Sequence, residues 1–262
     1  MFLVWGIYNL FNKGLLGWIL DKNGLTPADS ITAVWIGIAL LLCIAVSYLL
    51  GSVNFALVVS KFFYHDDIRN HGSGNAGATN ITRTYGKKAG LLTFFGDGFK
   101  GAVAILIACA VFGGTNPFLQ VMSAYLCAFI CILGHVFPCF SHFHGGKGFA
   151  TTAICVLFLN PVIFLILAVI FFTLVIGTKY VSLGSVVTVL FYPILLSSFD
   201  SLFSHYGVSV LFSLLIAALV TWAHRGNLKR IREGTERKFG EPKQPPQPPA
   251  KEEIEEDEED DT

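Results

Sequence analysis

The chain has 262 residues, of which 53% are hydrophobic and only 14% are charged, and its mean hydropathy is +0.63. This composition excludes an ordinary soluble domain and favours an integral membrane protein. The formal net charge is zero, but residues 252–261 are almost all acidic, so the rest of the chain is basic. We expect membrane lipids, and no nucleic acid, among its partners.

The N-terminal 30 residues are predicted to be an extension that precedes the membrane domain. Residues 1–20 are apolar and aromatic, but Asn12 and Lys13 interrupt them. They have no basic start and no small-residue cleavage site, so we expect no cleaved signal peptide. An interfacial helix and an additional span are both open for this segment. Residues 21–30, with Gly24 and Pro27, then connect it to the first apolar run.

Seven later segments are apolar enough to predict membrane-crossing helices. They comprise residues 31–62, 89–112, 118–138, 149–159, 162–177, 186–199 and 208–223. Gly51, Ser52 and Asn54 interrupt the first, which predicts a kink or close helix packing there. The fourth is short for a lone crossing, but a short helix can cross where the bilayer thins or protein shields it. The predicted fold class is an all-α integral membrane protein, with its membrane domain at 31–239.

The basic residues between these segments predict the orientation of the domain. Nearly every Lys and Arg lies in the loops 64–88, 139–148 and 178–185, or after residue 223. Lys and Arg accumulate on the cytoplasmic side of membrane proteins. We therefore expect these loops and the C-terminus in the cytoplasm and the N-terminus outside, although Lys13 and Lys22 would then also lie outside.

Residues 72–80, Gly-Ser-Gly-Asn-Ala-Gly-Ala-Thr-Asn, form the most distinctive polar loop. Glycine permits positive φ and a close approach of the backbone to a ligand. Successive exposed N–H groups in such a loop bind anions. A plain turn is the alternative, because Gly, Ser and Asn are common turn residues. The loop is not a Walker motif, since no Lys follows its last Gly.

The other predicted cytoplasmic loops add cations, hydroxyl groups and a second Gly-rich stretch at 145–148. Such groups suit phosphates and an acyl carbonyl. The cations are Arg83, Lys147 and Lys179, and Asn227 follows His224 by about one helical turn. The candidate phosphate-binding residues are Gly72, Gly74, Asn75, Thr79, Asn80, Gly145, Gly146, Gly148, Lys179, Ser182 and Ser185.

Two ionisable residues lie inside the second predicted span. Asp97 and Lys100 are three residues apart and therefore share a helix face. Ionisable groups are costly in lipid, so the two side chains must pair or face a wet cavity. A structural ion pair and the wall of a site are both open, and we favour the wall of a site.

We expect no metal and no cofactor. His135, His142 and His144 have no carboxylate or Cys companion at ligand spacing. The cysteines follow no disulfide or metal spacing and are interpreted as small buried apolar residues. A His-x4-Asp pattern, which many thioester-dependent acyltransferases use, follows none of the seven histidines.

Four stretches of the chain carry a resemblance to a known family. They are Asp67-Ile-Arg with the loop 72–80 and the basic residues to Lys88; Gly134-His-Val-Phe-Pro138 with Gly145-Gly-Lys-Gly148; Lys179-Tyr-Val-Ser-Leu-Gly-Ser185; and His224-Arg-Gly-Asn-Leu-Lys-Arg230 with Gly234-Thr-Glu236. In this order they resemble the signatures of the bacterial acyl-phosphate:glycerol-3-phosphate acyltransferases, the PlsY family, from about residue 48 to residue 239. The sequence departs from the family at Lys179, where Arg is usual, at His144, where Lys is usual, and at Asn54, where Pro or Thr is common.

The resemblance implies transfer of a fatty acyl group from acyl phosphate to glycerol 3-phosphate. The products would be lysophosphatidic acid and inorganic phosphate, in the first acylation of phospholipid biosynthesis. It implies a bacterial inner-membrane enzyme whose active site faces the cytoplasm, with an acyl-phosphate-producing enzyme as a partner. The family's active-site positions correspond to Ser73, Arg83, Lys147, His224 and Asn227, which are therefore the implied catalytic residues. The resemblance also implies an active-site position for Ser185.

Two other functions compete with the acyltransferase. A transporter for a phosphorylated metabolite would need polar groups near the bilayer midplane and inverted repeats, and only Asp97 and Lys100 lie within a span. A structural scaffold whose loops bind lipid headgroups leaves the Gly-rich loops unexplained. Residues 240–262 are Pro-rich and then acidic, and are predicted to be a disordered cytoplasmic tail.

Overall fold

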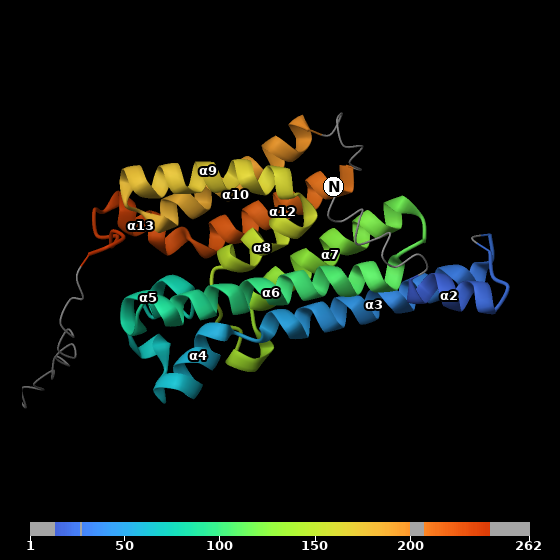
Figure 1. Cartoon of the computed structure of the whole chain (residues 1–262), viewed down its shortest axis with the longest axis horizontal. Coiled ribbons are helices and arrows are strands. Elements are labelled where there is room, and N and C mark those ends of the chain that lie inside the picture. The colour runs from blue at the N-terminus through green and yellow to red at the C-terminus, as the bar shows by residue number, and fades with distance from the viewer. Residues whose placement is uncertain (1–13, 27, 200–206, 242–262) are drawn as a thin grey trace, which may run out of the picture.

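A computed structural model describes residues 14–26, 28–199 and 207–241, and every regular element in these ranges is a helix. The long helices run along one axis and form an elongated bundle (Figure 1). They are α3 (Ser30–Ser52), α6 (Lys87–Phe112), α7 (Pro117–Val136), α9 (Pro161–Thr178), α10 (Val181–Ser198) and α12 (Gly207–Ala223). The shorter helices are α2 (Leu15–Lys22), α4 (Phe55–Tyr64), α5 (Ala78–Tyr85), α8 (Phe149–Leu159) and α13 (Arg225–Arg232), with 3₁₀ turns at Ile68–Asn70 and Cys139–Ser141. The expected all-α class is confirmed.

The lengths of the described helices support several membrane crossings. Five helical segments are long and apolar enough to span a bilayer: α3, α6, α7 with its following 3₁₀ turn, α9 and α10. A sixth results if α12 and α13, which meet at 54°, are taken as one bent span. The remaining predicted span is α8, whose 11 residues make a rod of about 16 Å, short of the ~30 Å hydrocarbon layer. The chain is therefore a multi-pass membrane protein, and the number seven stays a prediction.

The kink and close packing expected near Gly51, Ser52 and Asn54 are confirmed, and the break divides segment 31–62 into two helices. Helix α3 ends at Ser52, and Asn54 caps α4 by accepting a hydrogen bond from the Leu57 N–H at 3.1 Å. The expected polar interruption 178–185 is shorter than predicted. Helix α10 already begins at Val181, so Ser182 and Ser185 lie in its first turns.

Glycines allow α3 and α7 to pack with their backbones in contact. A Cβ atom on Gly134 would lie 2.5 Å from the Tyr48 carbonyl oxygen, and one on Gly51 would overlap the Cys131 carbonyl oxygen. Close backbone approach of this kind is a main source of helix association in lipid. The Tyr48 hydroxyl also donates to the Phe137 carbonyl oxygen at 2.8 Å, which holds the end of α7 beside α3.

A buried polar trio supports the turn between α8 and α9. The Asn160 side-chain amide donates to the hydroxyl groups of Tyr125 at 2.6 Å and of Tyr192 at 3.0 Å. All three side chains are buried within the main apolar core, which α6, α7, α8, α9, α10 and α12 share. Because every amide buried in such a core needs partners, the trio fixes where the chain reverses.

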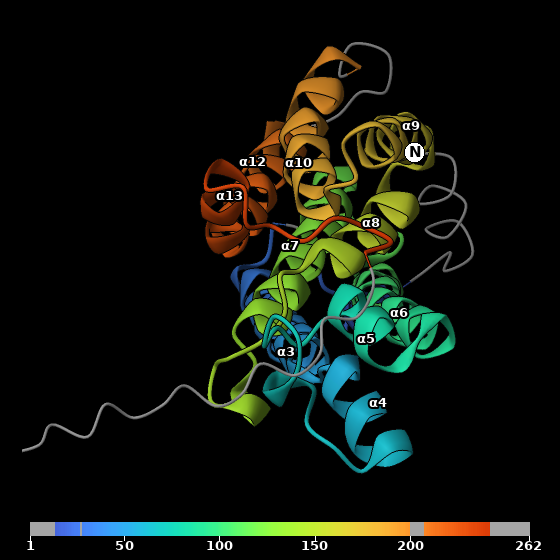
Figure 2. The ribbon, with the colours of Figure 1, turned by 90° about the vertical axis from the view of Figure 1, so that its left-hand side faces the viewer.

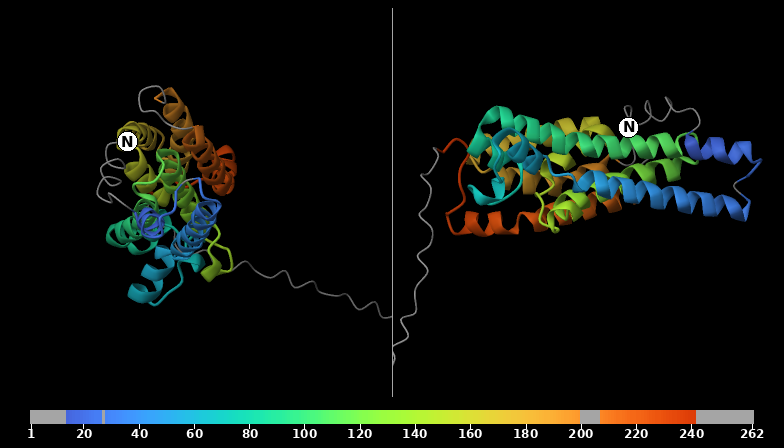
Figure 3. Two further views of the ribbon diagram at one scale, coloured as in Figure 1. Left: turned by 90° about the vertical axis from the view of Figure 1, so that its right-hand side faces the viewer. Right: turned by 90° about the horizontal axis from the view of Figure 1, so that it is seen from below.

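The described part of the N-terminal extension packs against the bundle (Figure 3). Helix α2 lies against the ends of α3 and α6 that are remote from α5 and α13, and Leu16 is 2% exposed there. The Gly14 N–H donates to the Gly113 carbonyl oxygen at 2.7 Å. The predicted interfacial helix or extra span at residues 1–20 lies largely outside the described residues, and the 8 residues of α2 are too few to cross a bilayer.

Candidate active site

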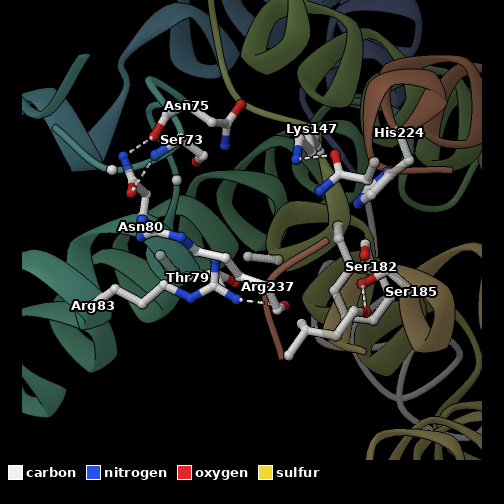
Figure 4. Close-up of a pocket in the computed structure, with 18 of the residues that line it drawn as sticks. Ser73, Asn75, Thr79, Asn80, Arg83, Lys147, Ser182, Ser185, His224 and Arg237 are labelled. Carbon is white, nitrogen blue, oxygen red and sulfur yellow. Dashed lines mark hydrogen bonds between the residues drawn. The ribbon is translucent and has the colours of Figure 1, made fainter. Parts of the chain in front are cut away.

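Four stretches that are far apart in the sequence line one cavity of about 280 Å³ (Figure 4). The cavity lies at the end of the bundle where α5 and α13 are found (Figure 1). The predicted site residues that line it are Gly72, Ser73, Asn75, Thr79, Asn80, Arg83, Lys147, Gly148, Ser182, Ser185, His224 and Asn227. The side chains labelled in Figure 4 surround a shared open space.

Four predicted residues lie elsewhere. Gly74, Gly145 and Gly146 line an adjacent hollow of about 360 Å³, which shares the walls formed by Asn75 and Lys147 with the cavity. Lys179 lines neither space. It ends α9 in the left-handed conformation with φ of 65°, and its carbonyl oxygen accepts a hydrogen bond from the Phe239 N–H at 2.7 Å. The three glycines and Lys179 therefore lie near the cavity but do not line it.

Asn80 shapes the first Gly-rich loop, residues 72–80, from inside. Its amide nitrogen donates to the carbonyl oxygens of His71 at 2.9 Å and of Asn75 at 3.1 Å, and its oxygen accepts from the Ser73 N–H at 3.2 Å. Gly72 has φ of 60°, and a Cβ atom on it would overlap the Asn80 side chain. This is why glycine is required there. The buried Asn80 amide thus folds the loop so that Ser73 lies at the cavity wall.

Lys147 enters the cavity from the second Gly-rich loop, residues 145–148. Gly148 follows it with φ of 81°, which turns the chain directly into α8. The Lys147 ammonium group donates a hydrogen bond to the side-chain oxygen of Asn227 on α13. Burial lowers the pKa of Lys147 to about 8; the carboxylate of Glu236 opposes this shift, and the cations Arg230 and Arg83 add to it.

Arg83 reaches the cavity from α5. Its guanidinium donates to the carbonyl oxygen of Arg237 at 3.1 Å. Burial lowers the pKa of Arg83, but a guanidinium remains protonated at neutral pH. In the part of the chain that the structure describes, neither Arg83 nor Lys147 forms an ion pair with a carboxylate. Two partly buried cations on one cavity without such partners favour the binding of anions.

A C-terminal strap, residues 233–241, crosses the end of the bundle beyond α13 (Figure 2). Glu236 anchors it by accepting hydrogen bonds from Ser182 at 2.7 Å, Asn227 at 2.6 Å and Arg230 at 2.8 Å. Burial raises the pKa of Glu236, but these hydrogen bonds outweigh it and hold the pKa below its usual value. The strap thus carries a charged acceptor that orients Asn227 toward Lys147.

Sequence analysis did not assign Arg230, Thr235, Glu236 and Arg237 to the site, although all four line the cavity. A signal for them was present, because Gly234-Thr-Glu236 belongs to the fourth stretch of the resemblance. Their roles were not predicted, because a strap that returns across a cavity leaves no periodic pattern in the sequence.

His224 lies at the junction of α12 and α13 with a defined protonation pattern. Its Nδ1 is 2.8 Å from the Val220 carbonyl oxygen. A carbonyl only accepts, so Nδ1 carries the proton, and in the neutral ring Nε2 keeps its lone pair. His224 lines the cavity. The ring can therefore accept a proton or a hydrogen bond through Nε2.

Apolar side chains complete the cavity wall beside these polar groups. Phe94 of α6, Phe149 of α8 and Val181 of α10 all line it. Among the described residues, no group of three His, Cys, Asp or Glu side chains is placed to hold a metal ion. A cationic cavity with an apolar wall at the end of a membrane bundle suits a substrate that carries both a phosphate and an acyl chain. These features define a membrane enzyme that acts on phosphorylated lipid precursors.

Comparison with known proteins identifies the family within this class. The family model described as "Glycerol-3-phosphate acyltransferase" matches residues 41–234. The chain belongs to this family of acyltransferases. It is 41% identical over 201 residues to the glycerol-3-phosphate acyltransferase of Clostridioides difficile (strain 630), a match that covers 76% of this chain and 95% of that protein. It is 43% identical over 197 residues to the glycerol-3-phosphate acyltransferase of Bacillus cytotoxicus, covering 75% and 93%.

Solved structures agree with this assignment. The chain is similar to PlsY, an integral membrane glycerol 3-phosphate acyltransferase, in its glycerol 3-phosphate form, with a TM-score of 0.68 and 34% identity over 77% of this chain and 96% of that one. The lysophosphatidic acid form of PlsY matches with a TM-score of 0.67 and 32% identity, over 77% and 95%. The expected family is confirmed, and the transporter alternative is not favoured.

Proposed function

We propose that the cavity transfers a fatty acyl group from acyl phosphate to glycerol 3-phosphate, giving lysophosphatidic acid and inorganic phosphate. The family and the names of the relatives support acylation of glycerol 3-phosphate. The observation that carries the proposal is the pair of cations, Arg83 and Lys147, that line one cavity and form no ion pair with a carboxylate among the described residues. An apolar wall adjoins them, as an acyl donor requires.

The proposed reaction needs positioning more than nucleophilic power. An acyl phosphate is already activated, so the glycerol hydroxyl can attack the carbonyl carbon directly. A C–O bond forms to the glycerol oxygen, the bond between the carbonyl carbon and the phosphate oxygen breaks, and inorganic phosphate leaves. His224 Nε2 accepts the hydroxyl proton. No acyl-enzyme intermediate forms in this scheme.

The remaining roles follow from the type and place of each group. Arg83 and Lys147 hold the two phosphates close together and offset their repulsion. Phosphate oxygens are bound by Ser73 and by N–H groups of the first Gly-rich loop, which lie across the cavity from Lys147 and His224 (Figure 4). Ser182 and Ser185 line the remaining wall, where Asn227 aligns Lys147. No metal or cofactor takes part in this scheme.

The donor is tested with purified protein, glycerol 3-phosphate and either palmitoyl phosphate or palmitoyl-CoA. We expect turnover with palmitoyl phosphate, essentially none with the thioester, and inhibition by high inorganic phosphate. Mass spectrometry of enzyme quenched with donor alone should detect no acylated Ser73. Comparable rates with both donors, or a stoichiometric Ser73 adduct, would overturn the proposal.

We further propose seven crossings in a bacterial inner membrane, with the cavity at the cytoplasmic face and the N-terminus outside. The distribution of Lys and Arg supports this orientation. It places the site where a soluble acyl-phosphate-producing enzyme can deliver its product. Single cysteines at Asn70, Ser141 and Arg232 should react with a reagent supplied from the cytoplasm, and one at Asn116 with a reagent supplied from outside. Labelling of the Asn70 and Asn116 positions from the same side would contradict the orientation.

A further inference from the structure

Three ionisable side chains, Asp97, Lys100 and His135, meet inside the bundle, and Asp97 and His135 also line the cavity. The ammonium group of Lys100 lies 3.1 Å from Asp97 Oδ1 and 2.8 Å from His135 Nδ1. All three side chains are almost completely buried, at 1% exposed for Asp97, 5% for Lys100 and 3% for His135. A buried ion pair adds little net stability compared with apolar side chains of the same volume. The attraction between the charges alone therefore does not explain this network.

The network holds the break between α3 and α4 in place. Lys100 also donates to the carbonyl oxygens of Gly51 at 2.8 Å and Val53 at 2.6 Å, which the end of α3 leaves without helical partners. Asp97 accepts a hydrogen bond from the N–H of Phe55, in the first turn of α4, at 3.1 Å. The ion pair thus satisfies the backbone on both sides of the break.

The same network touches both Gly-rich loops. Asn54, inside the break, donates from its side chain to the Ala76 carbonyl oxygen of the first loop at 3.2 Å. The His135 carbonyl oxygen accepts from the Gly146 N–H of the second loop at 3.1 Å. A Cβ atom on Gly146 would overlap His135 Nε2 and would lie 2.9 Å from the Ala76 carbonyl oxygen. The two loops therefore meet over the ring of His135.

Lys100 and Asp97 both contact the same edge of the His135 ring. His135 Nδ1 lies 2.8 Å from the Lys100 ammonium group and 3.3 Å from Asp97 Oδ1. These two contacts fix the orientation of the imidazole inside the bundle. The opposite edge of the ring, with Nε2, faces the Gly146 backbone, and this contact sets how closely the second loop approaches the first.

We propose that Asp97, Lys100 and His135 are positioning residues that fix the spacing between the two Gly-rich loops, and so the spacing of the two phosphates in the cavity. This inference rests on the proposed function. Asp97 and His135 also line the cavity, but in this proposal the three residues act through the loops and not on the reacting atoms. Loosening the network should therefore weaken phosphate binding more than it slows the chemical step.

The main test is His135→Asn. Asn retains a carbonyl oxygen near the place of Nδ1, so Lys100 keeps an acceptor, but the ring edge that contacts Gly146 is removed. We expect the KM for glycerol 3-phosphate to rise at least about tenfold, with kcat changed less than about threefold. The neutral double variant Asp97→Asn/Lys100→Met should show the same split. An unchanged KM in both variants, or a loss confined to kcat, would overturn the proposal.

Tyr125→Phe is the matched control. It removes a hydrogen bond from the buried polar trio on the same helix, α7, 10 residues and hence about 15 Å from His135. We expect it to lower the thermal unfolding temperature in detergent at least as much as His135→Asn and to leave KM unchanged. If it raises KM equally, the effect is a general loss of stability, and the positioning role is refuted.

A double-mutant cycle tests the contact itself. Gly146→Ala should raise the KM strongly in the wild-type background, because the new methyl group meets His135. The same change should cost at least about threefold less in the His135→Asn background, where the ring is absent and the close contact with the Ala76 carbonyl oxygen remains. Equal costs in the two backgrounds would contradict a direct coupling of ring and loop.

Direct binding separates this inference from the proposed function. Calorimetry with glycerol 3-phosphate alone should show at least about tenfold weaker binding to His135→Asn than to the wild type. If the wild type binds glycerol 3-phosphate but does not use acyl phosphate, the donor proposal fails and the positioning role stands. If the wild type turns over normally and the variant binds with wild-type affinity, only the positioning role fails.

Discussion

Lys147 donates a hydrogen bond to the side-chain oxygen of Asn227, 80 positions later in the chain. The amide group of Asn227 in turn donates to Glu236 at 2.6 Å, which also accepts from Ser182 at 2.7 Å. This series of contacts orients the ammonium group of Lys147 without pairing it with a carboxylate. Its charge therefore remains available to an anion, as the proposed phosphate binding requires.

Removing either cavity cation should reduce acyl transfer far more than removing a surface cation. Lys147→Ala and Arg83→Ala should each lower kcat/KM by at least roughly 10²-fold, about 2.7 kcal/mol, the scale for loss of one preorganised electrostatic contact. Lys238→Ala, in the strap but not among the residues that line the cavity, should have little effect. Equal losses of kcat/KM in all three variants would indicate that the loss reflects general surface charge and not a defined site.

The lowered pKa of Lys147 predicts a pH dependence of substrate affinity. With a pKa of about 8, Lys147 is a cation below that pH and neutral above it, so its attraction for phosphate is lost as the pH rises. We expect kcat/KM for glycerol 3-phosphate to fall between pH 7.5 and pH 9.5, roughly tenfold for each unit above the pKa if only the cation binds. A bound anion favours the charged form, so the fall in kcat should come at a higher pH.

Lys147→Arg is the control for this dependence. A guanidinium stays charged through this range, so any activity that the variant retains should be nearly independent of pH up to 9.5. If kcat/KM falls in parallel for the wild type and Lys147→Arg as the pH rises, another group controls this pH dependence, and Lys147 does not.

The glycine contact between α3 and α7 predicts a stability difference between two glycine-to-alanine variants. Gly134→Ala places a methyl group 2.5 Å from the Tyr48 carbonyl oxygen, so the helices must separate. We expect a lower unfolding temperature in detergent. Gly37→Ala, on the same helix pair, meets nothing within 4 Å and should be neutral or slightly stabilising, because alanine favours helix. A similar effect of both variants would refute the packing interpretation.

Sequence reasoning worked where the signal was periodic or compositional. Apolar runs located α6, α7, α9 and α12 to within two residues at each end, because lipid requires long apolar helices with no unsatisfied backbone. The Gly-rich loops and their cations indicated a phosphate site, because few other functions need that composition. Residues such as Ser73, Arg83 and Lys147 then proved to line one cavity.

The features that sequence reasoning missed depend on contacts between distant segments. The polar run 178–185 looks like a loop, yet Ser182 is inside α10 and bonds to Glu236 of the strap. Asp97 and Lys100 were expected to form a site wall, and Asp97 does line the cavity. Their partners, the backbone at the α3–α4 break and His135, have no fixed sequence distance from them. Asn80 was likewise expected to bind phosphate, whereas its amide holds the loop backbone.

The strap predicts that the position of a C-terminal truncation decides its effect. Truncation after Gly240 removes a segment that was predicted from composition to have no core, so activity and folding should remain close to those of the full chain. Truncation after Gly234 also removes Glu236, which leaves Ser182, Asn227 and Arg230 without their shared acceptor. An unpaired buried donor costs about 1–3 kcal/mol, so this shorter chain should unfold at a lower temperature and lose most of its transfer activity.

The variant Glu236→Gln in the full chain separates the effect of the strap from the effect of its charge. The amide oxygen still accepts a hydrogen bond from Asn227, but the ion pair with Arg230 is lost, so we expect an intermediate loss of activity. Thermal unfolding in detergent and acyl transfer, measured side by side for the three proteins, test this order. Full activity after truncation at Gly234, or a severe loss after truncation at Gly240, would show that the strap does not orient Asn227 and Lys147 as the structure indicates.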